Sequence, residues 1–168
     1  MDILVRSEAR GDEAAVGAVN EQAFGGSEEA RIVDTLRGSS GSLSLVATVD
    51  GRIVGHILFT PVRIEPERTA RVAGLGPMSV LPEMQRQGAG KALIAEGLAK
   101  CRRRGYVAVV VVGHPEYYPR FGFVQGSTRG LEYEQSVPSE AFMVLELVPG
   151  ALNGPPGVVH YRPEFYTV

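Results

Sequence analysis

Two glycines that stand two positions apart mark the part of the chain best suited to bind an anion. Gly88 and Gly90 lie where an apolar run ending at Val80 gives way, after a short loop, to a segment with helical periodicity from Gly88 to Arg104. The first N–H groups of a helix have no partner within it, and the helix dipole adds roughly half a positive charge there. Because glycine has no Cβ, an anion can approach these groups closely. The loop is therefore predicted to bind a phosphate, above all a pyrophosphate.

Two familiar phosphate-binding patterns fail in this loop. The Walker pattern G-x-x-x-x-G-K-[ST] requires glycine and a hydroxyl residue where the chain has Gln85 and Ala92, so the hydroxyl that binds magnesium is missing. The dinucleotide pattern G-x-G-x-x-G meets Leu93 at its third glycine. A protein that binds ATP or NAD is thus a minor alternative, and a glycine-containing turn without a ligand is the simplest one.

The pattern that does fit is Gln85-x-x-Gly88-x-Gly90, which resembles the pyrophosphate-binding signature [QR]-x-x-G-x-[GA] of the GNAT superfamily of acetyltransferases. A second segment, Tyr117-Tyr118-Pro119-Arg120-Phe121-Gly122-Phe123, resembles the Y-x-x-x-G-F segment of the same superfamily. Two motifs in the expected order outweigh a turn without a ligand. The resemblance covers most of the chain up to Val148, and the tail from Pro149 to Val168 is less diagnostic.

The elements that must position these motifs follow from periodicity and turn residues. Asp50-Gly51 between two apolar runs predicts a hairpin, since its tight turn needs positive φ. Residues 107–112 show no polar alternation, which is typical of a parallel strand buried on both faces. The expected strands are 2–6, 45–49, 52–59, 71–80, 107–112, 141–148 and 158–161, and the expected helices open at Asp12-Glu13, after a Ser27 cap, and at Gly88.

The resemblance implies a fold of the α/β (α+β) class in a single domain over residues 1–168. In the GNAT acyl-CoA N-acyltransferase fold, helices flank a mixed, mostly antiparallel sheet whose parallel fourth and fifth strands splay apart. Coenzyme A lies in the resulting cleft, with its pantetheine arm along the fourth strand. The strand from about Arg71 to Val80, the helix from Gly88 and the strand 107–112 correspond to this crossover.

By the same resemblance, the chain is expected to be an N-acetyltransferase (EC 2.3.1.-) that uses acetyl-CoA as co-substrate in a ternary complex with an amine. The implied coenzyme-binding residues are Met78, Ser79 and Val80 on the strand and Gln85, Arg86, Gln87, Gly88, Ala89, Gly90 and Lys91 in the loop. Tyr118 is the implied general acid, because a phenol of ordinary pKa about 10 is a reasonable proton donor to the departing thiolate. The alternative role for Tyr118 is packing of its ring.

The general base is not identified by the sequence. Many GNAT enzymes carry a glutamate on the fourth strand, but residues 73–80 contain no acid. Glu29, His114, Glu116 or a water chain are open as bases, and His114 is equally well explained as a loop residue. Glu28 and Glu29 would suit a cationic acceptor, although acids in a first helical turn usually complement the dipole. Tyr117 is expected to be structural or to line the acceptor site.

Composition narrows the partners. The chain has 168 residues and a formal net charge of -2, so it offers no basic field for nucleic acid. Its one cysteine, Cys101, shares an apolar helix face and is expected in the core. His56 and His160 lack metal-ligand spacing, so no metal is expected. Without a leader-like start or an apolar run of about 20 residues, the chain is expected to be cytoplasmic, with no membrane partner.

The acceptor is expected to be a small-molecule or peptide amine, and the resemblance allows a homodimer. The competing interpretation is a GNAT-fold module that binds acetyl-CoA as a sensor or partner-binding domain without strong catalysis, which the missing strand acid keeps open. A nucleotide-binding protein would be favoured only if ATP or NAD protected the fold better than coenzyme A.

Overall fold

The structure is a computed structural model that describes residues 1–167. Two compact units can be distinguished in it. The first unit comprises Met1–Phe59, Gly76–Ala99 and the C-terminal segment from Pro163, and the second unit comprises Thr60–Leu75 and Lys100–Arg162. Three elements contribute residues to both units, namely β3 (Arg52–Pro61), β5 (Val72–Val80) and α3 (Ala89–Arg103).

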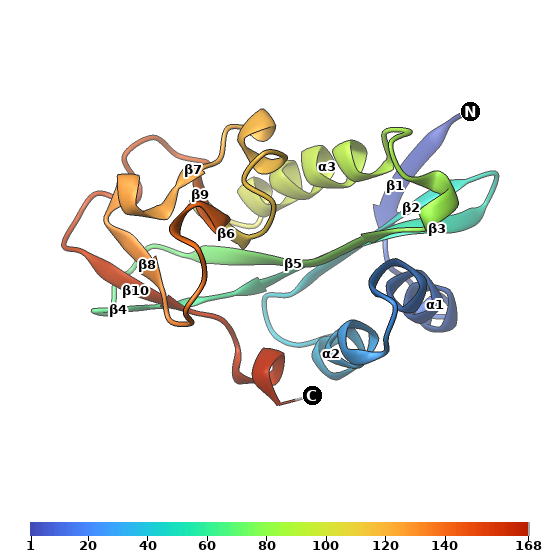
Figure 1. Cartoon of the computed structure of the whole chain (residues 1–168), viewed down its shortest axis with the longest axis horizontal. Coiled ribbons are helices and arrows are strands. Elements are labelled where there is room, and N and C mark those ends of the chain that lie inside the picture. The colour runs from blue at the N-terminus through green and yellow to red at the C-terminus, as the bar shows by residue number, and fades with distance from the viewer. Residues whose placement is uncertain (168) are drawn as a thin grey trace. The chain divides into compact units, whose positions relative to one another are not determined.

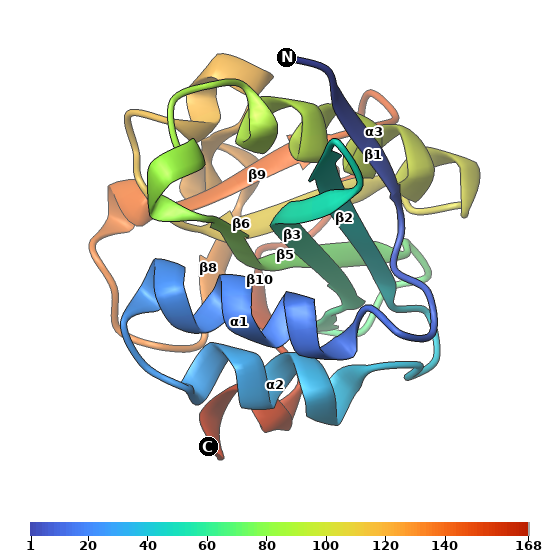
Figure 2. The same ribbon diagram turned by 90° about the vertical axis from the view of Figure 1, so that its right-hand side faces the viewer.

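Antiparallel strands and helices on both of their faces make up the first unit. The strands β1 (Ile3–Ser7), β2 (Leu43–Val49) and β3 pair in chain order. The helices α1 (Glu13–Phe24) and α2 (Glu28–Leu36) lie side by side against one face of β2 and β3, and α3 lies on the other face (Figure 1, Figure 2). A short helical turn, η5 (Pro163–Tyr166), packs against α2. Because both faces are covered, β3 is buried along nearly its whole length instead of alternating.

The hairpin prediction is confirmed. Asp50 and Gly51 connect β2 to β3 with φ of 50° and 78°, and Val49 pairs with Arg52. Ser27 is the N-cap residue of α2, as predicted, but its side chain makes no capping hydrogen bond. Its backbone lies in the right-handed helical region (φ −101°, ψ 0°), whereas a capping side chain works from an extended backbone.

A second set of strands and short helical turns forms the second unit. The parallel strand predicted at 107–112 is β6 (Ala108–Val112), and it pairs with β5 from Val72–Ala108 to Leu75–Val111. The remaining elements are β4 (Arg63–Glu65), η2 (Tyr118–Phe121), β7 (Val124–Gln125), η3 (Gly126–Arg129), β8 (Leu131–Tyr133), η4 (Ser139–Ala141), β9 (Phe142–Glu146) and β10 (Gly157–His160). The antiparallel β9 continues the sheet beside β6, and β7 pairs with β9.

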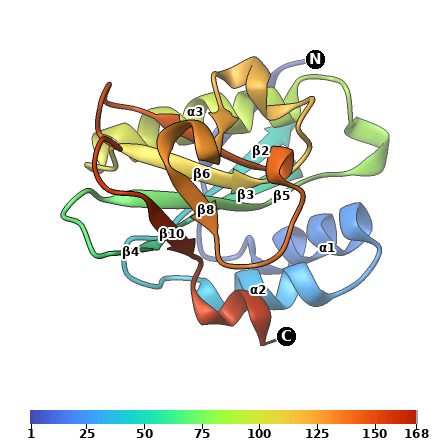
Figure 3. The same cartoon turned by 60° about the vertical axis from the view of Figure 1, so that its left-hand side comes forward.

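A small separate sheet in the second unit joins distant parts of the chain. The strand β10 lies between β4, which is antiparallel to it, and β8, which is parallel to it (Figure 3). Sequence analysis expected strands close to β9 and β10 but missed β4, β7 and β8. Segments of two or three residues show no measurable alternation, so the chemical pattern gives no signal for them. The predicted mixed, mostly antiparallel arrangement is confirmed.

Candidate functional site

A turn of unusual backbone geometry precedes α3 in the first unit. After β5 the chain passes through a short helical turn, η1 (Pro82–Met84), and then reaches Arg86 with φ of 63° and Gly88 with φ of 99°. Left-handed conformations of this kind, followed by a helix start, direct successive N–H groups toward one point. Arg86 adopts a conformation that costs a non-glycine residue free energy, and such residues are frequent at binding sites.

The N–H groups of this loop have no acceptor among the residues that the structure describes. From Arg86 to Lys91, none of the backbone amides donates to another of the residues 1–167. The first helical hydrogen bond of the segment runs from Ala92 N–H to the Gly88 carbonyl, at 3.0 Å. Most of the loop is exposed, including Arg86, Gln87 and Gly88, so a solvent-borne ligand can reach the amides. The predicted phosphate loop thus presents an open row of donors at the positive end of α3.

Two glutamine side chains stabilise the loop. Gln85 donates from Nε2 to the Val80 carbonyl at 3.2 Å, and Gln87 donates from Nε2 to the Glu83 carbonyl at 3.2 Å. Both bonds tie the loop to the chain that precedes it, so the glutamine of the motif acts here through the conformation of the loop. Sequence reasoning assigned Gln85 a ligand contact and could not see this bond, because it depends on the turn through η1.

The end of β5 offers a second set of backbone groups. Leu81 N–H donates to the Val54 carbonyl of β3 at 2.8 Å. Since backbone groups alternate along a strand, those of Met78 and Val80 point to the edge away from β3. Ser79, between them, directs its backbone toward β3, and its buried hydroxyl has no partner among the described residues. The recorded pairing of β5 with β6 ends at Leu75.

Tyr118 lies in the second unit at the start of η2. Its side chain is buried, and its ring meets those of Tyr117 and Phe123 edge-on, with centroid distances of 5.2 and 5.7 Å. The ring also lies on Gly113, where an added Cβ would stand 2.4 Å from Cε2. In the part of the chain that the structure describes, its hydroxyl makes no hydrogen bond. Burial, with a smaller contribution from Tyr117, raises the pKa of Tyr118, so the phenol stays protonated at neutral pH.

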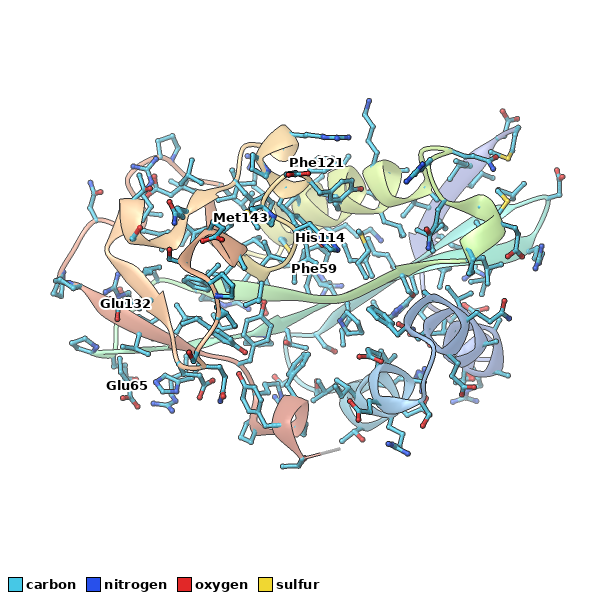
Figure 4. All side chains as sticks on the ribbon, viewed as in Figure 1. Phe59, Glu65, His114, Phe121, Glu132 and Met143 are labelled. Atoms are coloured by element: carbon cyan, nitrogen blue, oxygen red, sulfur yellow. The ribbon has the colours of Figure 1, made fainter. Side chains whose placement is uncertain are left out.

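The other candidates divide between the two units. His114 (labelled in Figure 4), Glu116 and Tyr117 lie close to Tyr118 in sequence. His114 and Glu116 are exposed, and Tyr117 is half-buried. The His114 carbonyl accepts hydrogen bonds from the N–H groups of Tyr117 and Tyr118 at 3.1 and 3.4 Å, so this residue shapes the turn before η2. In the first unit, Glu28 and Glu29 occupy the first turn of α2, as predicted.

Cys101 and His56, which were given no catalytic or metal-binding role, both lie in the protein interior. Cys101 is buried, and burial raises the pKa of its thiol to about 12, which suits a core residue and not a nucleophile. His56 is fully buried in a polar network that the sequence gave no reason to expect. No cluster of metal-binding side chains occurs in residues 1–167, and no helix in that range is long and apolar enough to cross a membrane.

Comparison with known proteins identifies the family of the chain. A sequence model of the Acetyltransferase (GNAT) domain matches residues 5–126. The chain is 35% identical over 165 residues to the uncharacterized N-acetyltransferase YhbS of Escherichia coli (strain K12), covering 97% of this chain and 98% of that protein.

Solved structures agree with this assignment. The crystal structure of the GNAT family N-acetyltransferase YhbS from Escherichia coli in complex with CoA matches with a TM-score of 0.90 at 34% identity, covering 97% of this chain and 91% of that one. A GNAT family acetyltransferase from Brucella melitensis in complex with acetyl-CoA matches with a TM-score of 0.79 at 37% identity, over 98% of each chain. The chain has the GNAT fold and belongs to the GNAT family of N-acetyltransferases.

Proposed function

We propose that this enzyme transfers an acetyl group from acetyl-CoA to a primary amine, by direct attack within a ternary complex. The observation that carries the proposal is the row of amides from Arg86 to Lys91 at the start of α3, which have no acceptor within residues 1–167. A pyrophosphate satisfies these donors and is stabilised by the helix dipole. The related structures that hold CoA or acetyl-CoA support coenzyme A as the owner of that pyrophosphate.

The free edge of β5 would bind the pantetheine arm. Met78 directs its peptide groups away from β3, which suits a hydrogen bond to one amide of pantetheine. The Val80 carbonyl accepts from Gln85 Nε2 and has a second lone pair for the other amide. We assign the Val80 N–H as the donor to the thioester oxygen, on which negative charge develops as the amine attacks. Arg86 and Lys91 are exposed cations that would add attraction for the phosphates.

Breakdown of the tetrahedral intermediate breaks the C–S bond and releases a thiolate. We assign Tyr118 as the acid that gives its phenolic proton to this sulfur, since its hydroxyl is protonated and has no hydrogen-bond partner among residues 1–167. The proton lost by the amine passes to Glu29, to His114, to Glu116 or to a water chain. The acceptor itself is a small-molecule or peptide amine.

A loop variant tests the proposal. Replacing Gly88 by alanine puts a Cβ on a residue with φ of 99° in the row of amides, where it strains the turn and hinders the pyrophosphate. Gly11→Ala is the matched control in the same unit, because Gly11 has φ of 101° and open space around its Cβ position. Isothermal calorimetry measures the Kd of each variant for acetyl-CoA and for coenzyme A.

We expect Gly88→Ala to weaken coenzyme A binding by at least about tenfold, the loss of roughly one or two charge-assisted hydrogen bonds, and Gly11→Ala to bind like wild type. If the folded wild-type protein binds neither acetyl-CoA nor coenzyme A, the proposed function is wrong. ATP or NAD binding more tightly than coenzyme A would point instead to a nucleotide-binding protein.

One observation favours a second candidate. The strand β5 has the sequence VAGLGPMSV, so it carries no carboxylate to serve as a base. A protein that binds acetyl-CoA as a sensor, without strong catalysis, needs no such base. A thiol-release assay with acetyl-CoA and a panel of amines separates the two, because a sensor binds the coenzyme and releases no thiol above the rate without amine.

A further inference from the structure

Tyr161 is a buried tyrosine for which the proposed chemistry has no role. It follows β10 and sends its side chain into the second unit, where it is only 8% exposed. The ring lies directly on Gly74 of β5, since a Cβ added there would stand 2.7 Å from Cζ. Only a glycine at position 74 therefore leaves room for the ring, and the two residues form a matched pair.

The hydroxyl of Tyr161 spans two neighbouring strands. It donates to the Leu75 carbonyl of β5 at 2.9 Å, and the Val110 carbonyl of β6 lies 3.2 Å away as a second acceptor. These carbonyls belong to the last two rungs of the parallel ladder, Gly74–Val110 and Leu75–Val111. Beyond them β5 runs on to Val80, outside the recorded pairing with β6.

Glu134 fixes the backbone that carries Tyr161. One carboxylate oxygen accepts the Tyr161 N–H at 3.0 Å, and the other is 3.0 Å from Nδ1 of His160. The strand β10 lies between β4 and β8 (Figure 3). Val158 of β10 pairs with Glu65 of β4 and with Glu132 of β8, and both glutamates are labelled in Figure 4. The ring of Tyr133 adds an edge contact, with centroids 5.8 Å apart.

We propose that Tyr161 is a positioning residue for acetyl-CoA. Its side chain fixes the point where β5 and β6 stop pairing. By bridging the last rungs, the hydroxyl holds Leu75, which is joined through only two residues to Met78, so the chain that carries Met78 and Val80 starts from an anchored point. This inference rests on the proposed function, in which the backbone of Met78 and Val80 binds pantetheine. It gives the C-terminal segment a part in coenzyme binding, although that segment contains neither motif.

Tyr161→Phe is the direct test, because it keeps the ring on Gly74 and removes only the O–H donor. We expect the Kd for coenzyme A, measured by calorimetry, to rise roughly three- to tenfold, the usual effect of one buried hydrogen bond. The calorimetric stoichiometry should remain that of wild type. A purely structural role would lower the fraction of folded protein, and with it the stoichiometry, while the Kd stayed the same.

Amide hydrogen exchange gives a second readout on the folded fraction. In Tyr161→Phe, we expect faster exchange in peptides covering the last rungs, residues 72–76 and 108–113. Tyr106→Phe is the matched control, since Tyr106 is another buried tyrosine of the second unit, with its ring beneath the Arg71 guanidinium. Glu134→Gln, which weakens the hold on the Tyr161 backbone, should shift the Kd in the same direction by a smaller factor.

The inference is overturned if Tyr161→Phe binds coenzyme A with the wild-type Kd, or if Tyr106→Phe raises the Kd as much. Either result leaves the proposed function intact, provided that wild type binds coenzyme A. Absence of binding by wild type would instead reject the proposed function first.

Discussion

At the scale of single residues, Tyr118 has the two properties that a proton donor to a thiolate needs. Its phenol carries its proton at neutral pH, as a phenol of ordinary pKa about 10 already does, and its hydroxyl is committed to no hydrogen bond within the described residues. Tyr118→Phe keeps the ring packing on Gly113 and the edge contacts with Tyr117 and Phe123. We expect kcat to fall by about a hundredfold, as is typical for loss of a general acid, with an unchanged Kd for acetyl-CoA.

The check is steady-state kinetics with an accepted amine, alongside calorimetry on the same preparation. Tyr106→Phe serves as control and should retain kcat within about threefold, since Tyr106 is a buried tyrosine with no part in the proposed site. Unchanged turnover in Tyr118→Phe would rule out its role as the acid.

His56 is held neutral inside the first unit. Ser44 donates its hydroxyl hydrogen to Glu8, so Nε2 of His56, 2.8 Å from Ser44 Oγ, must be the donor of that pair. The other ring nitrogen, Nδ1, then accepts from the Asn20 amide at 3.3 Å. Burial, and to a smaller extent the positive charge of Arg37, lowers the pKa of His56 to about 3.

This pKa predicts a loss of stability in acid. The pKa of His56 is about 3 in the folded state and 6.5 in the unfolded state. Between these pH values His56 binds a proton in the unfolded chain and stays neutral in the folded chain. The contribution of neutral His56 to the free energy of unfolding is complete above pH 6.5. It is lost as the pH falls toward 3, with a slope approaching about 1.4 kcal/mol per pH unit. Urea unfolding of wild type and of His56→Gln between pH 3 and pH 7 measures how the free energy of unfolding of each protein depends on pH. Parallel pH profiles for the two proteins would contradict the prediction.

At the scale of elements, two helical glycines have opposite surroundings. Gly97 of α3 lies against Phe59, where an added Cβ would stand 2.4 Å from Cε2, so the helix can approach β3 only without a side chain there. Gly17 of α1 has open space around its Cβ position. We expect Gly97→Ala to destabilise the fold by about 1–3 kcal/mol through overpacking. Gly17→Ala should stabilise it by up to about 1 kcal/mol through helix propensity.

Chemical denaturation of the two variants beside wild type is the measurement. Because both changes add the same methyl group to a helix interior, the difference between them isolates the packing against Phe59. Equal effects of the two substitutions would mean that α3 does not pack on Phe59 as closely as the structure shows.

At the scale of the whole molecule, coenzyme binding should stabilise the folded chain. A ligand that binds only the folded state adds about 2.7 kcal/mol at one hundred times its Kd. For a chain of this size that corresponds to a rise in Tm of roughly 5–10 °C. Thermal unfolding with acetyl-CoA, ATP and NAD at equal concentrations gives the comparison. The prediction is contradicted if acetyl-CoA leaves Tm unchanged, or if a nucleotide raises it further.

The sequence by itself determined the elements whose signals are local. The loop from Gln85 to Gly90, the hairpin at Asp50-Gly51 and the buried strand at 107–112 each depend on neighbouring residues, so their chemistry is legible in a few consecutive positions. The same holds for the two motifs that point to an acetyltransferase. The short strands β4 and β8 lie beyond this reach, since both exist only by pairing with β10, far along the chain.

Only the tertiary structure decided which distant residues act together. Tyr161 and Leu75 are 86 positions apart, yet one hydroxyl joins them, and Ser44 and Glu8 are 36 positions apart in the network around His56. Neither contact is announced by a pattern in the sequence. The residue type at each position suits the shape and polarity of a site that forms only when the strands pair. Free amides and a missing Cβ are properties of one segment, whereas a partner across the fold is a property of its packing.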